Sequence, residues 1–160
     1  MPNKPDAAII KCLNTVLTGE LTAINQYFLH SEMCADWGYE RLHQKIRRES
    51  IDEMKHAEQL IERVLYLGGI PNVQKLDRIV IGENVEEMLE SDKALEQLAI
   101  PRLNTGIALA VKKGDNGTRH LLESILTSEE EHLDWLEAQH DQIAQMGIAN
   151  YLANQVKEEE

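Results

Sequence analysis

Two copies of one short motif, Glu-x-x-His, are the part of this sequence best suited to chemistry. One copy is Glu53 with His56, and the other is Glu129 with His132. Residues three positions apart in an α-helix lie on nearly the same side, so each copy projects a carboxylate and an imidazole together. Oxygen and imidazole ligands suit iron, manganese or zinc. The motif therefore predicts a metal site.

Two further glutamates complete a repeated spacing. Glu20 and Glu53 stand 33 residues apart, as do Glu96 and Glu129, and all four interrupt apolar stripes. An ionised, unpaired carboxylate buried on such a stripe would lower the stability of the folded state by several kcal/mol. The pattern indicates two pseudo-symmetric helical pairs that converge on two metal ions, as in di-iron carboxylate bundles. Four carboxylates balance two divalent ions, and they balance two trivalent ions that share an oxide, which favours a redox metal over zinc.

Long amphipathic helices must position these side chains. Leu, Ala, Glu, Gln and Lys dominate, Gly and Pro are sparse, and apolar residues recur every three or four positions. Strand-like alternation is absent from the sequence. Gly38, the pair Gly68-Gly69 and the turn-rich stretch 114–117 separate the helices. We expect four long helices over 6–37, 39–67, 84–112 and 118–146, and a short fifth helix over 148–156.

The linker 68–82 is longer than a helical hairpin needs. About 15 extended residues reach roughly 50 Å, enough to run the length of a helix of about 29 residues. The second and third long helices can therefore run parallel, joined by one long crossover. This predicts an all-α fold, a ferritin-like four-helix bundle, with residues 1–160 as one domain. Pro101 falls inside the third helix, where we expect a kink and not a boundary.

The net charge, the N-terminus and the two cysteines limit the partners and the cellular compartment that we expect for this protein. Sixteen Lys+Arg against 28 Asp+Glu give a net charge of −12, which argues against nucleic acid because phosphate binding needs a basic face. The N-terminus lacks the features of a signal peptide and no apolar run approaches about 18 residues, so we expect a cytoplasmic protein without membrane association. Cys12 and Cys34 would lie roughly 33 Å apart on one helix, so we expect free thiols.

Four stretches of the sequence resemble bacterioferritin. They are GELTAINQYF at 19–28, ESIDEMKHA at 49–57, ENVEEML at 83–89 and HLDWLE at 132–137. The similarity covers essentially the whole chain, and these stretches are specific to that family among ferritin-like bundles.

The resemblance implies a dinuclear iron centre in which Glu53 and Glu129 bridge the two irons. The other implied ligands are Glu20 with His56 for one iron and Glu96 with His132 for the other. The resemblance further implies oxidation of Fe(II) by O2 or H2O2, with storage of the mineral in a homo-oligomeric shell of twenty-four subunits. A ferredoxin is the implied reductant of the stored iron.

The resemblance also implies b-type haem, one per two-fold dimer, with Met54 of both subunits as the ligand. Met54 lies about 100° around the helix from Glu53, which points its side chain away from the core. A thioether is a soft, neutral ligand that keeps haem low-spin. One position departs from the family, since many members carry a His where this chain has Arg48. This departure leaves open whether an accessory iron site lies beside Asp52.

Other functions remain open from the sequence alone. A di-iron peroxidase of the rubrerythrin type would normally add Cys-x-x-Cys ligands, which this sequence lacks, and an oxygenase would need room for an organic substrate. A non-catalytic bundle or haem carrier would use metal only to relieve buried carboxylates. We expect Tyr27 and Trp135 to pack beside the site. The remaining histidines are expected at the surface or in hydrogen bonds: His30, His43, His120 and His140.

Overall fold

The helices begin and end at capping residues and glycines. The computed structural model describes residues 5–157, and its helices are α1 (Ala7–Asp36), α2 (Glu40–Tyr66), α3 (Val85–Lys113), α4 (Asn116–Met146) and α5 (Ile148–Ala153). Asp6 and Asn84 cap α1 and α3, because their side-chain oxygens accept hydrogen bonds from free backbone N–H groups of the first turn. Gly114 ends α3 in the left-handed conformation, with φ 69°, which glycine adopts without strain.

Two helix ends differ from the prediction by more than one residue. Helix α4 begins at Asn116 and not at Thr118, because the Asp115 carboxylate caps it by accepting hydrogen bonds from the backbone N–H and the hydroxyl of Thr118. The predicted turn is therefore shorter than expected. Helix α5 ends at Ala153 rather than at Val156. Directly after Ala153 the chain forms a tight turn, in which the backbone N–H groups of Asn154 and Gln155 donate to Tyr151 O and Leu152 O.

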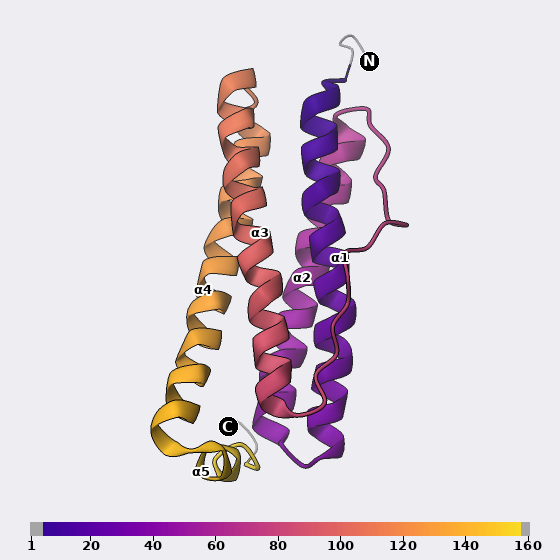
Figure 1. The fold of residues 1–160 in the computed structure, drawn as a ribbon. Coiled ribbons are helices and arrows are strands. Elements are labelled where there is room, and N and C mark those ends of the chain that lie inside the picture. Colours follow the sequence, from indigo (N-terminus) through magenta and orange to yellow (C-terminus); the bar gives the residue numbers. More distant parts are fainter. Residues whose placement is uncertain (1–4, 158–160) are drawn as a thin grey trace.

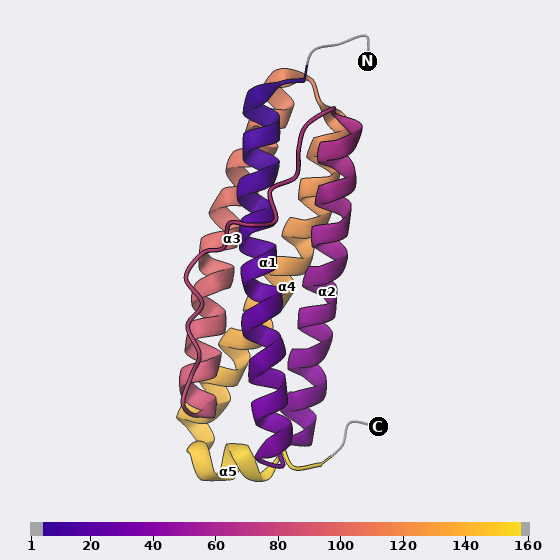
Figure 2. The ribbon, with the colours of Figure 1, turned by 90° about the vertical axis from the view of Figure 1, so that its right-hand side faces the viewer.

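The helices pair as two antiparallel hairpins, α1 with α2 and α3 with α4 (Figure 1). The segment between α2 and α3 runs back along the bundle, so that α2 and α3 are parallel (Figure 2). Helix α5 lies across one end of the bundle. The predicted four-helix bundle with one long crossover and a short fifth helix is thereby confirmed. No strand is present in residues 5–157.

Apolar side chains fill the bundle as two clusters, one toward each end. The first cluster includes Leu13, Leu17, Ala57, Leu60, Leu103, Leu122 and Ile125. The second cluster includes Ala23, Tyr27, Leu42, Ile46, Leu89 and Leu136. Burying a large apolar side chain contributes about 1.5–3 kcal/mol, so the two ends stabilise the fold. Along each long helix the predicted glutamate falls between the two clusters, which leaves the middle layer for polar chemistry.

Helix α3 continues through Pro101, as predicted. The proline removes one backbone N–H donor from the helix. Because Pro101 is exposed, it lies on the side of α3 where water can bond to the carbonyl that loses its partner. The helix therefore continues to Lys113.

Buried polar side chains of α1 hold the crossover against the bundle. Each accepts a hydrogen bond from a backbone N–H of the crossover, and the pairs are Asp77 N to Thr22 Oγ1 (2.8 Å), Val80 N to Gln26 Oε1 (3.0 Å) and Gly82 N to His30 Nε2 (3.0 Å). Arg102 of α3 also donates twice to the Asp77 carboxylate, at 2.6 and 3.1 Å. Sequence analysis missed these hydrogen bonds. The available signal was the spacing of Thr22, Gln26 and His30, three polar residues four positions apart on an apolar helix. His30 is hydrogen-bonded as predicted, but it is fully buried.

Substituting alanine for Gly82 is expected to destabilise the crossover. A Cβ atom there would collide with the backbone of Glu87 and Met88, which cannot move aside like a flexible side chain. We expect the free energy of unfolding to fall by more than about 2 kcal/mol in urea denaturation. Gly19→Ala is the matched control, because its Cβ would find Arg102 Nη1 at 3.3 Å and the helix gains about 0.5–1 kcal/mol. Equal stability of the two variants would contradict this close approach.

Helix α1 is long and apolar enough, by length and composition alone, to cross a membrane. It is the single such helix in the described part of the chain, and 44% of its most apolar stretch is buried in the bundle. Its buried side includes Glu20, Gln26 and His30 and packs against α2 and α3. Helix α1 is therefore apolar because it is a core helix of the bundle.

Candidate metal centre

Four glutamates and two histidines meet in the middle of the bundle. The four glutamates are at most 2% exposed. Their ligand atoms form two groups, within each of which all atoms lie within 4.8 Å of one another. The first group is Glu20, Glu53, His56 and Glu129, and the second is Glu53, Glu96, Glu129 and His132. The structure therefore brings together all six residues singled out by spacing, and Glu53 and Glu129 belong to both groups.

Each histidine contacts a carboxylate that comes from another helix. His56 Nδ1 on α2 lies 3.1 Å from Glu129 Oε1 on α4 and 3.5 Å from Glu20 Oε2 on α1. His132 Nδ1 on α4 lies 2.9 Å from Glu96 Oε1 on α3. The His56 side chain is 12% exposed, and it is the most open of these residues. His56 therefore joins the two hairpins through Glu129, whereas His132 and Glu96 belong to the same hairpin.

Three glutamates and both histidines of this centre have pKa values above their ordinary values. Burial, reinforced by neighbouring carboxylates, raises the pKa of Glu96 to about 8 and that of Glu129 to about 7, and burial also raises the pKa of Glu53. Burial opposes the charged form of the histidines, but hydrogen bonds to carboxylates outweigh it and raise the pKa of His56 to about 10 and of His132 to about 9. Protons therefore neutralise part of the charge that metal ions would neutralise.

Two buried carboxylate oxygens of the centre lack a hydrogen-bond partner among residues 5–157. They are Glu20 Oε2 and Glu96 Oε2, one in each hairpin. An unsatisfied buried carboxylate oxygen is costly, and a cation at ligand distance would satisfy it. The donor set of carboxylates and imidazoles therefore fits a pair of divalent cations.

Tyr27 closes one side of the centre. Its hydroxyl donates a hydrogen bond to Glu96 Oε1, and its ring meets His132 edge-on with 5.2 Å between centroids. Burial and the nearby Glu96 charge raise the pKa of Tyr27 well above its ordinary value, so the phenol stays a neutral donor. Tyr27 lies beside the site as expected, and it also holds Glu96 in place.

Glu49 is a neighbour of the centre that sequence analysis missed. It is buried one helical turn before Glu53, with Oε2 at 3.6 Å from His132 Nδ1. Its other oxygen pairs with Lys45 Nζ at 2.8 Å. Trp135 stacks on His132 with 6.2 Å between centroids, which places it beside the site as expected. Four-residue spacing from Glu53 was the available signal for Glu49.

Asp92 connects the centre to the crossover and was also missed. Its Oδ1 lies 2.8 Å from both Gln26 Nε2 and His30 Nδ1, two residues that hold the crossover backbone. Asp92 precedes Glu96 by one turn of α3. The position of Glu96 is therefore braced by the same network that fixes the crossover.

Met54 does not join the centre. Its side chain is 57% exposed on α2, facing outward as the helical geometry predicts. Phe28, on the antiparallel α1, is also exposed, at 55%. Both are exposed apolar side chains of the α1–α2 hairpin.

A four-helix bundle with one long crossover and a middle layer of four glutamates and two histidines defines the ferritin-like class of proteins. The ferritin-like domain family matches residues 10–146. The bacterioferritin of Mycobacterium leprae (strain TN) and bacterioferritin BfrA of Mycobacterium tuberculosis (strain ATCC 25618 / H37Rv) are each 44% identical over 153 residues, covering 96% of this chain and 95% of theirs. The bacterioferritin of Streptomyces coelicolor is 43% identical over 153 residues, covering 96% and 92%. The chain belongs to the bacterioferritin family, as its sequence predicted, and this supports iron storage as its role.

Proposed function

We propose that this protein oxidises Fe(II) to Fe(III) with O2 or H2O2 at its buried centre and stores the product in a hollow shell of twenty-four identical subunits. The observation that carries the proposal is the set of buried carboxylates and imidazoles, in which one carboxylate oxygen of each hairpin lacks a partner among the described residues. Family membership supports iron as the metal.

In this proposal Glu53 and Glu129 bridge the two irons, because each belongs to both ligand groups. The remaining ligands divide between the hairpins as Glu20 with His56 and Glu96 with His132. Two Fe(II) ions supply two electrons together, so that O2 and two protons give H2O2 without release of superoxide. Protons displaced from the carboxyl and imidazolium groups by the entering iron are available for this step.

The cavities of the molecule favour a small oxidant over an organic substrate. Five cavities within residues 5–157 are lined by residues other than the six proposed ligands. An oxygenase or rubrerythrin-type reaction on a larger substrate would need a cavity lined by these ligands. Fe(II), O2 and H2O2 are the substrates that fit.

The test is a stopped-flow titration of metal-free protein with Fe(II) in air, recording the oxidation rate and the O2 consumed per iron. We expect a fast phase that saturates near two irons per chain, followed by slower turnover in which the iron stays soluble. A fast phase without further uptake would instead indicate a di-iron enzyme with another substrate. Absence of any fast phase would leave a structural or haem-binding protein.

We also propose that Met54 binds b-type haem, with a second Met54 from another copy on the opposite face of the haem. The supporting observations are the exposed thioether of Met54 on α2 and the exposed ring of Phe28 on α1 of the same hairpin. Bound haem would supply one-electron transfer, for which a ferredoxin is the proposed donor. The proposed dimer would bury these exposed apolar side chains of the α1–α2 hairpin.

The variant Met54→Leu is expected to lose bound haem while its fast phase of Fe(II) oxidation is unchanged. Leucine preserves the apolar surface but removes the sulfur ligand, so we expect the low-spin haem absorbance to fall by about tenfold or more. Met146→Leu, at a partly exposed methionine of α4, is the control for loss of a thioether elsewhere. Full haem content in Met54→Leu would assign the haem to other ligands.

We further propose a cytoplasmic location for this protein, with residues 1–160 as one domain and no nucleic acid or membrane partner. Cys12 and Cys34 are free thiols on α1, which fits a reducing compartment. The net charge of −12 gives the chain the wrong sign for phosphate backbones.

A further inference from the structure

Asp92 of α3 is a buried carboxylate that lies outside the proposed ligand set. The residue is 1% exposed, and its Oδ1 accepts hydrogen bonds from two side chains of α1, Gln26 Nε2 and His30 Nδ1, each at 2.8 Å. Helices α1 and α3 belong to different hairpins, so these hydrogen bonds connect the two halves of the bundle. They do so one helical turn before Glu96.

The crossover orients both donors to Asp92. His30 Nε2 accepts the backbone N–H of Gly82 at 3.0 Å, so Nδ1 is the ring nitrogen that donates to Asp92. Gln26 Oε1 accepts the backbone N–H of Val80 at 3.0 Å, which turns the amide nitrogen toward Asp92. Each donor is therefore held at two ends, and neither can rotate without losing a buried hydrogen bond.

Tyr27 connects Asp92 to Glu96. The Tyr27 hydroxyl lies 3.4 Å from the backbone oxygen of Asp92 and donates a hydrogen bond to Glu96 Oε1. The other oxygen, Glu96 Oε2, is buried and has no hydrogen-bond partner among residues 5–157. One oxygen of Glu96 is thus held by a residue outside the ligand set, while the other is left for a cation.

The contacts of His56 are of a different kind. Its Nδ1 lies near carboxylate oxygens of Glu129, Glu20 and Glu53, at 3.1, 3.5 and 3.7 Å. All three glutamates are proposed ligands, so entering metal would replace these contacts. The hydrogen bonds that Asp92 accepts involve no proposed ligand, so they remain when metal enters. Contacts of this second kind fix a ligand both before and after metal binds.

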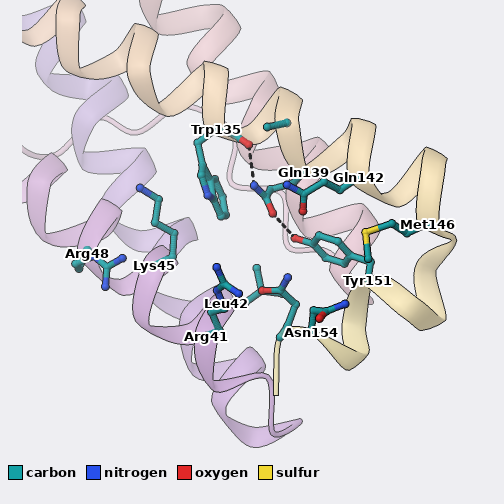
Figure 3. A pocket seen from close by; sticks show the side chains of 12 residues that line it. Arg41, Leu42, Lys45, Arg48, Trp135, Gln139, Gln142, Met146, Tyr151 and Asn154 are labelled. Atoms are coloured by element: carbon teal, nitrogen blue, oxygen red, sulfur yellow. Dashed lines mark hydrogen bonds between the residues drawn. The ribbon is translucent and has the colours of Figure 1, made fainter. Parts of the chain in front are cut away.

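The other side of His132 is less constrained. Trp135 stacks on His132 and also lines a cavity of about 480 Å³ where α2 begins, α4 ends and α5 folds across the bundle (Figure 3). Because the Trp135 ring borders a cavity, packing fixes it less than it fixes Tyr27, which is fully buried and meets His132 edge-on. The rigid neighbours of this ligand pair are therefore those on the side of Tyr27.

We propose that Asp92 is a positioning residue of the iron centre, which holds Glu96 in place before iron arrives. The position formed by Glu96 and His132 is then the more preorganised of the two proposed iron positions. This inference rests on the proposed function, because it takes Glu96 as an iron ligand. It adds that the crossover, through Gln26 and His30, takes part in preparing the site.

The test is a titration of the full, iron-free chain with Co(II), followed by calorimetry and by the visible absorbance of bound Co(II). We expect the wild type to bind two Co(II) ions per chain. Asp92→Leu removes the acceptor and is expected to weaken binding of one ion by about tenfold or more, the usual cost of losing a residue that orients a ligand, and to change the absorbance of that ion. Affinity for the other ion should change by less than about threefold.

Three further variants identify the cause of this loss. Asp92→Asn keeps an oxygen acceptor in the same place and should restore most of the affinity for that ion. Tyr27→Phe keeps the buried ring, removes the hydroxyl and should weaken the same ion. Glu86→Gln is the matched control, because Glu86 is an exposed acidic residue of α3, and it should change neither affinity. Circular dichroism and the melting temperature establish which variants fold, and Tyr27→Phe provides the test if Asp92→Leu does not.

Wild-type affinity for both ions in Tyr27→Phe or in folded Asp92→Leu would overturn the proposal. Equal weakening of both ions in a folded variant would also overturn it, because this would indicate a general loosening of the bundle. So would an Asp92→Asn variant as weak as Asp92→Leu, since the acceptor would then not be the cause. A wild type that binds no Co(II) would instead refute the proposed function itself, and this inference with it.

Discussion

Replacing Glu129 by glutamine is expected to abolish the fast phase of Fe(II) oxidation. Glutamine preserves the shape of the side chain but removes the negative charge of Glu129, a residue that belongs to both ligand groups. Loss of a group that merely orients a metal ligand costs about 10–100-fold, so loss of a residue proposed to bridge both irons should cost more than about 100-fold in rate. Stopped-flow absorbance at two irons per chain measures this directly.

The matched control for this variant is Glu130→Gln. Glu130 is the next residue of α4 and is exposed, so the same chemical change leaves the centre intact and the rate unchanged. Circular dichroism of both metal-free variants checks that the bundle folds. A normal fast phase in Glu129→Gln would remove Glu129 from the reaction and move the oxidation elsewhere.

The metal-free protein is expected to lose stability as the pH rises from 5.5 to 8.5. Folding raises the pKa of Glu96 from 4.5 to about 8 and of Glu129 from 4.5 to about 7. It raises the pKa of His56 from 6.5 to about 10 and of His132 from 6.5 to about 9. The native state therefore binds more protons than the unfolded state throughout this range, so the free energy of unfolding falls with rising pH. Urea denaturation at three pH values should show a decrease of a few kcal/mol.

Bound divalent metal should reverse this trend. A metal ion replaces the protons on the same carboxyl and imidazole groups, so its affinity and its stabilising effect increase with pH. Zn(II) is a suitable probe because it does not oxidise. In Glu96→Gln the pH dependence of the metal-free protein should flatten, which separates the centre from the general repulsion of an acidic surface. Increasing stability of the metal-free wild type between pH 5.5 and 8.5 would refute the assignment.

The helices and the composition of the middle layer could be predicted from sequence because both depend on local spacing. Helical periodicity places Glu53 and His56 on one side of α2, and the interruption of apolar stripes marks Glu20 and Glu96 as inward-facing. The repeat of 33 residues then relates the two hairpins. No long-range contact was needed for these inferences.

The features that sequence analysis missed all depend on contacts between distant segments. Thr22 and Gln26 are ordinary polar residues of a helix until the crossover lies against them and supplies backbone donors. Arg41 and Arg48 line a cavity together with residues of α4 and α5, and only the fold of α5 across the end of the bundle brings these segments together. The cap at Asp115 was overlooked because glycines on both sides suggested a longer turn.

The division of the centre between two hairpins has a consequence for the folding pathway. Each hairpin holds one lone glutamate and one Glu-x-x-His, and its helices are joined by a short turn, so each can form through local contacts. The centre exists only after the long crossover has brought the hairpins together, and that step forces four carboxylates into one dry layer. We therefore expect docking of the two hairpins to slow at high pH, and protons or divalent ions that neutralise the layer to speed the formation of the native bundle.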